Sequence, residues 1–410
     1  MIPRTVMPQV EREIELKPVV LITGARQCGK TTLCKMISEK HGFGYVSLAD
    51  RRERAMAEKD PELFLNIHPA PLIIDEAQYA KGLFAALESV IDERKFRTGS
   101  NEGMYILTGS QIYRLMEGVS ESMAGRVSII HMSPLSISEI AGRDEPPFEV
   151  DIERCIERST SLSTDAQDIF KRMVRGSYPE LFQKPRLKTS KFYSDYLDTY
   201  IARDVSEIIN LKDKDKFLRF VEVAASLTGQ ELVYETICNA VGVTIPTVES
   251  WLRILQLGGI IHLLPAYVER STVKRVVKRP KLYFCDTGLA CYLARIFDPE
   301  SLRAGYLSGP MLETFIVNEI LKTYSNNTES AGFYYYRDSK KNEIDLIMLK
   351  NGELTLIESK AGTNFGSDDL KAFRLLKKSD YTIGPSCIIC LTDKAFPLME
   401  GVYALPVTSI

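Results

Sequence analysis

The segment that most constrains the fold is residues 24–31, which read GARQCGKT. Every fixed position of the phosphate-loop pattern G-x-x-x-x-G-K-[ST] is filled. The apolar residues 19–23 before this segment predict a buried strand, and the residues after it have helical spacing, with apolar side chains at Leu33, Met36 and Ile37. Because the pattern lies between a strand and a helix, it predicts a phosphate-binding loop rather than a chance glycine-rich turn.

We expect this loop to bind ATP together with Mg²⁺. Glycines let the backbone turn tightly and bring N–H groups toward phosphate oxygens, and the following helix adds its positive amino end. Lys30 should reach the β- and γ-phosphates, and the Thr31 hydroxyl should bind the Mg²⁺ ion. The residues expected to contact the nucleotide are Gly24, Ala25, Arg26, Gln27, Cys28, Gly29, Lys30, Thr31 and Thr32.

A second motif, PLIIDEAQ, supplies two carboxylates. Residues 72–74 are apolar and predict a buried strand, and Asp75 and Glu76 follow at its carboxyl end. We expect Asp75 to hold the Mg²⁺ ion through water and Glu76 to act as the general base that polarises the attacking water.

Two later positions are candidates for the same reaction. The apolar segment MYILTGS ends in Thr108, Gly109 and Ser110, and Ser110 is expected either to sense the γ-phosphate or to cap a helix. Arg126 precedes another apolar strand, residues 127–132. We expect Arg126 either to stabilise transition-state charge, in its own chain or in a neighbour, or to form a surface salt bridge.

The alternation of strands and helices from Pro18 to about Ile140 predicts an α/β fold, a doubly wound parallel sheet over residues 1–140. Residues 141–214 are expected to form a linker and a helical region. Residues 215–280 have the spacing of a winged helix-turn-helix. Its wing is basic, which suits either DNA phosphates or a solvated loop on a protein-binding module, and the basic residues are Arg270, Lys274, Arg275, Lys278, Arg279 and Lys281.

Residues 281–410 predict a second α/β domain. Two strand-like segments are joined at Asn351-Gly352, a strong hairpin signal, and they carry Asp345, Glu358 and Lys360. A preceding helix carries Glu313 at the border of its apolar face. This order is that of a restriction-endonuclease-like core, in which Glu313, Asp345 and Glu358 would bind Mg²⁺ beside Lys360. An ordinary hairpin, or neutralisation of the acids by Lys360, is the alternative.

Taken together, the motifs resemble a bacterial and archaeal family of AAA-type P-loop ATPases. Their C-terminal domain of unknown function resembles nucleases of the Holliday-junction-resolvase type. The resemblance rests on GARQCGKTTL, LIIDEAQ, YILTGS, SMAGR, GSYPE, YIARDV, PKLYFCDTGL, MLETF and NEIDLIM with IESK. It implies ATP binding and hydrolysis, with a nuclease-like module behind the ATPase. Ser359 departs from the apolar residue usual inside E-x-K, and we expect it to point to the opposite strand face and not to disturb the site.

Composition narrows the cellular setting. Lysine and arginine residues number 52 against 54 aspartates and glutamates, so no strong basic field favours nucleic acid. No apolar run approaches the ~18 residues that span a membrane, and the opening residues lack the apolar core of a secretory signal. Eight scattered cysteines favour a reduced, cytoplasmic protein, with Cys387 and Cys390 in a buried strand.

Two functions are consistent with these observations. The first is Mg²⁺-dependent ATP hydrolysis coupled to a C-terminal DNA-binding or nuclease-like module. The alternative is a nucleotide-gated protein-interaction switch in which the nuclease-like part is a catalytically inactive scaffold. ATP is the expected ligand in both, and DNA, a protein partner and self-association remain open.

Overall fold

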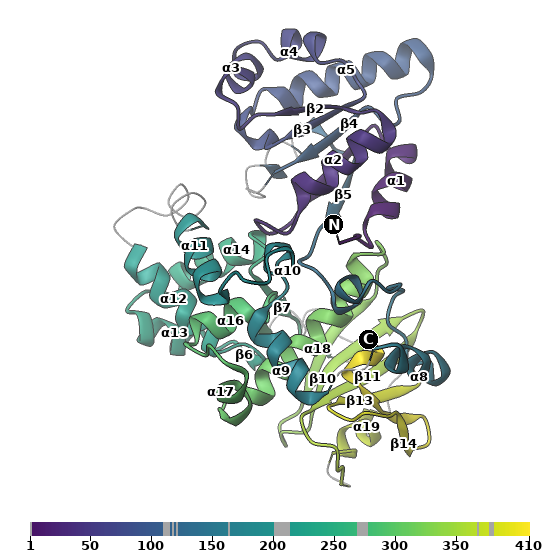
Figure 1. Cartoon of the computed structure of the whole chain (residues 1–410), viewed down its shortest axis with the longest axis vertical. Helices are drawn as coiled ribbons and strands as arrows, with labels where there is room; N and C mark the ends of the chain where they lie inside the picture. The colour runs from purple at the N-terminus through teal and green to yellow at the C-terminus, as the bar shows by residue number, and fades with distance from the viewer. Residues whose placement is uncertain are drawn as a thin grey trace. The chain divides into compact units, whose positions relative to one another are not determined.

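The structure is a computed structural model that describes residues 2–109, 115, 116, 119, 122–162, 165–200, 214–268, 278–366, 369–376 and 381–410. The chain divides into two compact units (Figure 1). The first comprises Met1–Leu135, Leu257–Gly259 and Ser325–Thr328, and the second comprises Ser136–Gln256, Ile260–Tyr324 and Glu329–Ile410.

A five-stranded, entirely parallel sheet forms the centre of the first unit, in the order β2-β3-β4-β1-β5. Its strands are β1 (Val19–Thr23), β2 (Gly44–Ser47), β3 (Leu72–Asp75), β4 (Tyr105–Thr108) and β5 (Val127–His131). The predicted parallel α/β sheet is therefore confirmed. All the strands run the same way, so their carboxyl ends meet at one edge of the sheet.

Helices cover both faces of this sheet. The side chains of Val19 and Leu21 pack into one core with helices of residues 51–98. Those of Val20 and Ile22 pack into a separate core with helices of residues 7–41. This burial on both faces explains why β1 is apolar throughout. The helices are α1 (Met7–Leu16), α2 (Lys30–His41), α3 (Arg51–Lys59), α4 (Pro61–Ile67) and α5 (Leu83–Thr98), with a short 3₁₀ turn η1 (Ala77–Tyr79) after β3.

The second unit begins with helices. They are α7 (Ile137–Ala141), α8 (Ile152–Ser161), α9 (Ala166–Arg175), α10 (Pro179–Gln183), α11 (Thr189–Tyr200), α12 (Lys214–Ser226), α13 (Tyr234–Val241) and α14 (Ile245–Leu257). Helix α8 falls within residues 141–214, where we expected a linker and a helical region. The Asp151 side chain accepts a hydrogen bond from the Arg154 N–H and so caps α8, and Cys155 on α8 is buried. Ile152 of α8 packs against the same core as Cys155.

A three-stranded antiparallel sheet follows, in the order β6 (Gln230–Glu231), β8 (Lys281–Phe284) and β7 (Ile261–Leu264). The three helices before β7 and this small sheet match the element order that predicted a winged helix, an assignment that stays a prediction. The predicted domain boundary between residues 280 and 281 also stays a prediction. However, β8, which we placed in the C-terminal domain, pairs with β6 and β7.

The rest of the second unit is a mixed sheet with helices. The strand order is β14-β15-β13-β11-β10-β9, with β12 beside β11. At the predicted β10–β11 hairpin, Asn351 and Gly352 both have positive φ, 54° and 81°, as a tight two-residue turn requires. The elements are α16 (Thr287–Leu293), α17 (Pro299–Ala304), α18 (Ser308–Ser325), β9 (Gly332–Arg337), β10 (Glu343–Lys350), β11 (Glu353–Lys360), α19 (Lys371–Leu376), β12 (Thr382–Ile383), β13 (Ser386–Cys390), β14 (Phe396–Met399), β15 (Val402–Pro406) and η4 (Val407–Ser409).

The expectations for the two cysteines of β13 and for membrane-spanning helices can be compared with the structure. Cys387 and Cys390 are buried in β13, as expected, and pack into different cores on opposite faces of the sheet. They are therefore not placed to bind one metal ion together. Across the described ranges of the chain, no helix has the length and apolar character needed to cross a membrane.

Candidate functional site

The phosphate loop connects β1 to α2 at the carboxyl edge of the parallel sheet. Gly24 has a φ of 142°, and a Cβ at this position would lie 2.1 Å from the carbonyl oxygen of Met132, which follows β5. Only glycine therefore fits where the loop leaves β1. Gln27 and Gly29 also have positive φ, 59° and 105°, so the loop turns back on itself before α2 begins.

Lys30 lies at the start of α2, and its ammonium group folds over the loop. Nζ donates hydrogen bonds to the carbonyl oxygens of Gly24 and Ala25, both at 2.8 Å. The side chain is buried, with 7% of its surface exposed. These two carbonyls hold the ammonium charge close to the path of the loop backbone, where a phosphate group would be bound.

Thr31 and Asp75 meet beside the loop. The Thr31 hydroxyl donates to Oδ2 of Asp75 at 3.3 Å, and the hydroxyl of Tyr45, on the neighbouring strand β2, donates to the same oxygen at 2.7 Å. Burial raises the pKa of Asp75, and the hydrogen bond from Tyr45 opposes that shift. A hydroxyl and a carboxylate in contact are suitable ligands for Mg²⁺. Nothing in the sequence marked Tyr45 as part of this group.

Glu76 follows Asp75 in a left-handed backbone conformation, with φ 57° and ψ 43°. This conformation is costly for a residue with a side chain and is concentrated at functional sites. The Gln78 side chain donates from Nε2 to Oε2 of Glu76 at 2.5 Å, and Gln78 itself is 2% exposed. A Cβ at Gly109 would lie 2.0 Å from Oε1 of Gln78, so the glycine after β4 makes room for this amide.

The two other candidates in the first unit differ in outcome. Ser110 lies outside the described residues. Thr108 lies two residues earlier, at the end of β4, and is fully buried. Its hydroxyl has no hydrogen-bond partner within the described part of the chain. Arg126 lies immediately before β5, whose first residue Val127 is paired with Val19, the first residue of β1.

Arg126 is therefore at the amino edge of the sheet, opposite the phosphate loop, and this corrects its predicted role in its own chain's site. Its guanidinium instead binds α5, with Nε and Nη2 donating to the Asp92 carboxylate at 2.9 and 2.7 Å. Nη1 lies 3.1 Å from Oε1 of Glu88. The structure thus matches the surface salt-bridge alternative, because parallel strands separate the residues at their two ends.

Two of the three predicted nuclease acids, Glu313 and Asp345, lie around Lys281, which we had assigned to the basic wing. Lys281 of β8 is 2% exposed, and Nζ lies 2.7 Å from Glu313, 2.5 Å from Glu343 and 3.3 Å from Asp345. The Tyr283 hydroxyl also donates to Glu313, at 2.5 Å. Burial lowers the pKa of Lys281, but the charges of Glu313 and Asp345 raise it by more, so the net shift is upward. The ammonium therefore remains charged among the acids.

Residues of β11 alternate between the two faces of the mixed sheet. Leu356 packs into the core with α19, and Ile357 packs into the core with α18. Glu358 and Lys360 therefore extend from the α19 face of the sheet, and Ser359 extends from the α18 face. Asp345 is directed toward Ser359, because Oδ2 accepts hydrogen bonds from the Ser359 N–H at 2.9 Å and hydroxyl at 2.6 Å. Ser359 therefore lies on the opposite strand face from Glu358 and Lys360, as expected, and from that face it bonds to Asp345.

The carboxylates of Asp345 and Glu358 consequently have different cations. Glu358 lies 3.0 Å from Nζ of Lys360 and accepts a hydrogen bond from the Asp345 backbone N–H at 3.3 Å, whereas the Asp345 side chain pairs with Lys281. This differs from both predicted arrangements, in which the acids together bind one or two Mg²⁺ ions or are neutralised together by Lys360. The pairing between β9 and β10 is irregular between Ile344 and Ile347, and this breaks the alternation on which that prediction rested.

No group of three or more His, Cys, Asp or Glu side chains placed to hold a metal ion is found among the residues that the structure describes. The structure also bears on the residues predicted to form a basic wing. Lys281 is buried and cannot reach a phosphate backbone, while Arg279 lies 4.0 Å from Glu235 at the surface. Arg270, Lys274 and Arg275 lie outside the described residues.

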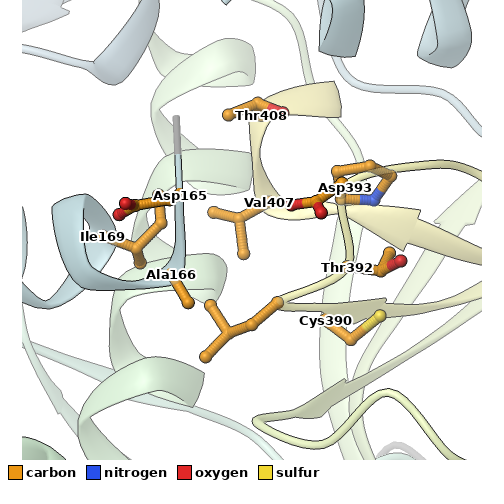
Figure 2. A pocket seen from close by; sticks show the side chains of 10 residues that line it. Asp165, Ala166, Ile169, Cys390, Thr392, Asp393, Val407 and Thr408 are labelled. Carbon is orange, nitrogen blue, oxygen red and sulfur yellow. The ribbon is translucent and has the colours of Figure 1, made fainter. Parts of the chain in front are cut away.

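A small cavity near the C-terminus does not offer a further ligand site. Figure 2 shows its lining, with Asp165 and Ile169 on the side of α9 and Asp393 after β13. Its volume of about 10 Å³ admits roughly one water molecule. None of the predicted site residues lines it.

Three family models match successive parts of the chain. Residues 16–141 match a family described as an AAA domain, residues 166–300 match one domain of unknown function, and residues 308–410 match another. The parallel sheet and the phosphate loop of the first segment agree with its match to the AAA domain family. The other two matches carry no activity, and a nuclease family is not among these three.

Two similar proteins match nearly the whole chain. The uncharacterized proteins Rv2008c of Mycobacterium tuberculosis and Mb2031c of Mycobacterium bovis are each 24% identical over 408 residues, which is 99% of this chain and 84% of theirs. Among solved structures, the Walker-type ATPase PABY2304 of Pyrococcus abyssi has a TM-score of 0.43 at 14% identity and covers 70% of this chain and 94% of its own. A RuvB variant of Thermotoga maritima has a TM-score of 0.31 at 16% identity, over 63% of this chain and 88% of its own. These structural likenesses do not extend to function.

Proposed function

We propose that the chain is an Mg²⁺-dependent ATPase. The observation that carries the proposal is the contact between the Thr31 hydroxyl and Asp75, 3.3 Å apart beside Lys30 and the phosphate loop. These two side chains come from different elements, α2 and β3, and the fold brings them together at the carboxyl edge of the sheet. A hydroxyl and a carboxylate so placed fit an Mg²⁺ ion that accompanies a nucleotide.

Each residue of the site has a distinct role in this proposal. Lys30 would release its two loop carbonyls and pair with phosphate oxygens, because an ammonium gains more from an anion than from neutral carbonyls. Thr31 and Asp75 would hold Mg²⁺, which when bound neutralises developing phosphate charge. Glu76 would accept a proton from the attacking water, with Gln78 holding its carboxylate in place.

The test is ATP turnover by the purified full chain in Mg²⁺, with excess EDTA as the control, with and without DNA, and at two salt concentrations. We expect Mg²⁺-dependent phosphate release. Equal phosphate release with Mg²⁺ and with EDTA, or none with Mg²⁺, would contradict the proposal. Stimulation by DNA that is lost at the higher salt concentration would favour a DNA-coupled ATPase, because phosphate contacts weaken steeply with salt.

A specific observation favours the second candidate function for the C-terminal half. Lys281 provides an internal cation to Glu313 and Asp345, the acids that a nuclease would need for its metal. We therefore propose that residues 281–410 are a catalytically inactive scaffold, and that ATP binding gates an interaction with a protein partner. The family matches over these residues name no activity and are compatible with either candidate.

Nuclease activity separates the two candidates directly. The full chain would be incubated with linear and branched DNA in Mg²⁺ and in Mn²⁺, and the products separated on a gel. We expect intact DNA. Metal-dependent cutting that disappears in Asp345→Asn would show that the acids are used and would overturn the scaffold proposal.

A further inference from the structure

Tyr45 is the residue beside the Mg²⁺ site whose role the sequence did not suggest. It lies in β2, the edge strand of the parallel sheet, next to β3. Its ring is half-buried and packs against the core formed with α1 and α2, and its hydroxyl reaches across to Oδ2 of Asp75 at 2.7 Å. Two hydroxyl groups donate to this oxygen, and the contact from Tyr45 is shorter than the contact from Thr31.

The second hydroxyl contact comes from Thr31, whose oxygen is the expected Mg²⁺ ligand. A threonine hydroxyl can offer a lone pair to a cation and still donate its hydrogen to a carboxylate. Asp75 can therefore keep both donors when the site is loaded. Of the two, only Tyr45 has no expected contact with nucleotide or metal, and its hydroxyl bonds to the Asp75 carboxylate.

Asp75 needs such a partner because it is buried. The residue is 6% exposed, and a carboxylate in this setting is stable when hydrogen bonds satisfy its oxygens. Metal-binding carboxylates are themselves held by hydrogen bonds from a surrounding shell of residues, which fix their orientation. The ring of Tyr45 is anchored by packing, which makes it a rigid donor rather than a flexible one.

We infer that Tyr45 is a positioning residue of the Mg²⁺ site: its hydroxyl orients the Asp75 carboxylate for the metal and does not contact the nucleotide. This inference rests on the proposed function, since it assigns a role within the same site. It predicts that removing the hydroxyl weakens metal binding more than it weakens nucleotide binding or folding.

The direct test is Mn²⁺ binding in the presence of saturating ADP, followed by electron paramagnetic resonance. We expect Tyr45→Phe to bind Mn²⁺ about tenfold more weakly than the wild-type chain, the usual size of an effect from this shell. Tyr105→Phe is the matched control, because Tyr105 is a buried tyrosine at the amino edge of the same sheet. Tyr45→Phe with wild-type Mn²⁺ affinity would overturn the inference.

A double-variant cycle distinguishes positioning from a general loss of structure. In an Asp75→Asn background, Tyr45→Phe should change Mn²⁺ affinity less than about twofold, since the hydroxyl acts through the carboxylate. An undiminished effect of Tyr45→Phe in that background would mean that the hydroxyl acts by another route. Thermal unfolding of each variant, expected within a few degrees of wild type, confirms that Mn²⁺ affinity is compared between folded proteins.

The two proposals fail in different ways. A wild-type chain that binds Mn²⁺ with ADP but releases no phosphate from ATP would contradict the ATPase function and leave the Tyr45 effect on Mn²⁺ measurable. A chain that hydrolyses ATP while Tyr45→Phe keeps the wild-type Mg²⁺ requirement would contradict only the role of Tyr45. A wild-type chain that binds no Mn²⁺ with ADP would overturn both.

Discussion

The ammonium group of Lys281 lies 2.7 Å from the carboxylate of Glu313, and the two side chains are 2% and 12% exposed. Lys281 comes from the three-stranded sheet and Glu313 from α18. Because a buried charge is stable only when it is paired, this contact ties the small sheet to the helix that packs on the mixed sheet. It also supplies the positive charge that a metal ion would bring to a nuclease site.

Lys281→Met should destabilise the chain by about 3–5 kcal/mol, the usual cost of leaving buried charges without their partner. Equilibrium unfolding in urea would measure the change. Lys278→Met is a suitable control, because Lys278 is exposed nearby and is expected to change stability by no more than about 0.5 kcal/mol. Adding Glu313→Gln to Lys281→Met should recover part of the loss. Equal stabilities for Lys281→Met and wild type would mean that the cluster contributes little to folding.

His262 should make the chain sensitive to acid. Its Nε2 is buried and lacks a hydrogen-bond partner within the described ranges, and burial lowers the pKa of His262 below the ordinary value of 6.5. Below that pH the unfolded chain binds more protons than the folded one, so the free energy of unfolding falls as the pH falls. Protonation of this one group can change the free energy of unfolding by at most about 1.4 kcal/mol per pH unit. His262→Phe should flatten the urea-unfolding profile between about pH 6.5 and pH 5; parallel profiles for the two chains would exclude this cause.

Lys30→Ala should weaken ATP binding about 10- to 100-fold, because the phosphates lose a charged hydrogen-bond donor. Titration with a fluorescent ATP analogue in Mg²⁺ measures this. Lys40→Ala provides the control, since Lys40 lies on the same helix but pairs with Glu11 at the surface. If Lys30→Ala binds the analogue as tightly as Lys40→Ala, the phosphate-loop assignment does not hold.

Glu76→Gln should bind ATP normally and hydrolyse it about 10²- to 10⁴-fold more slowly, because an amide keeps the shape of the side chain but accepts no proton. Single-turnover phosphate release and analogue binding separate these two effects. Glu88→Gln, which changes a half-buried acid on α5 away from the phosphate loop, should leave both unchanged. Turnover of Glu76→Gln at the wild-type rate would remove Glu76 from the mechanism.

Much of the first unit was predictable from local patterns. The strand at Val19–Thr23 and the helix from Lys30 follow from apolar periodicity around a glycine-rich turn, and the structure has both where they were expected. Asp75 at the end of β3 was also predictable, because strand ends in a parallel sheet converge on one edge. The hairpin at Asn351-Gly352 was predictable for a related reason, since few other residues accept positive φ at both positions.

Tertiary structure decided which charged groups meet. Arg126 and the phosphate loop adjoin two neighbouring strands, yet parallel pairing puts them at opposite edges of the sheet. Asp345 and Glu358 lie opposite each other in the β10–β11 hairpin, yet an irregularity in β10 directs the Asp345 side chain toward Ser359. Lys281 reaches both Glu313 and Asp345 only because β8, 32 and 64 residues earlier in the chain, is folded against them.

The sequence by itself therefore determined the elements whose signal is local: the phosphate loop, the strands and helices beside it, the acidic strand end and the tight hairpin. The fold alone decided that Tyr45 holds Asp75, that Gln78 holds Glu76 and that Lys281 pairs with Glu313 and Asp345. The physical reason is that backbone preference and apolar period act over a few residues. A buried charge, in contrast, selects its partner from whatever the packed chain brings within about 3 Å.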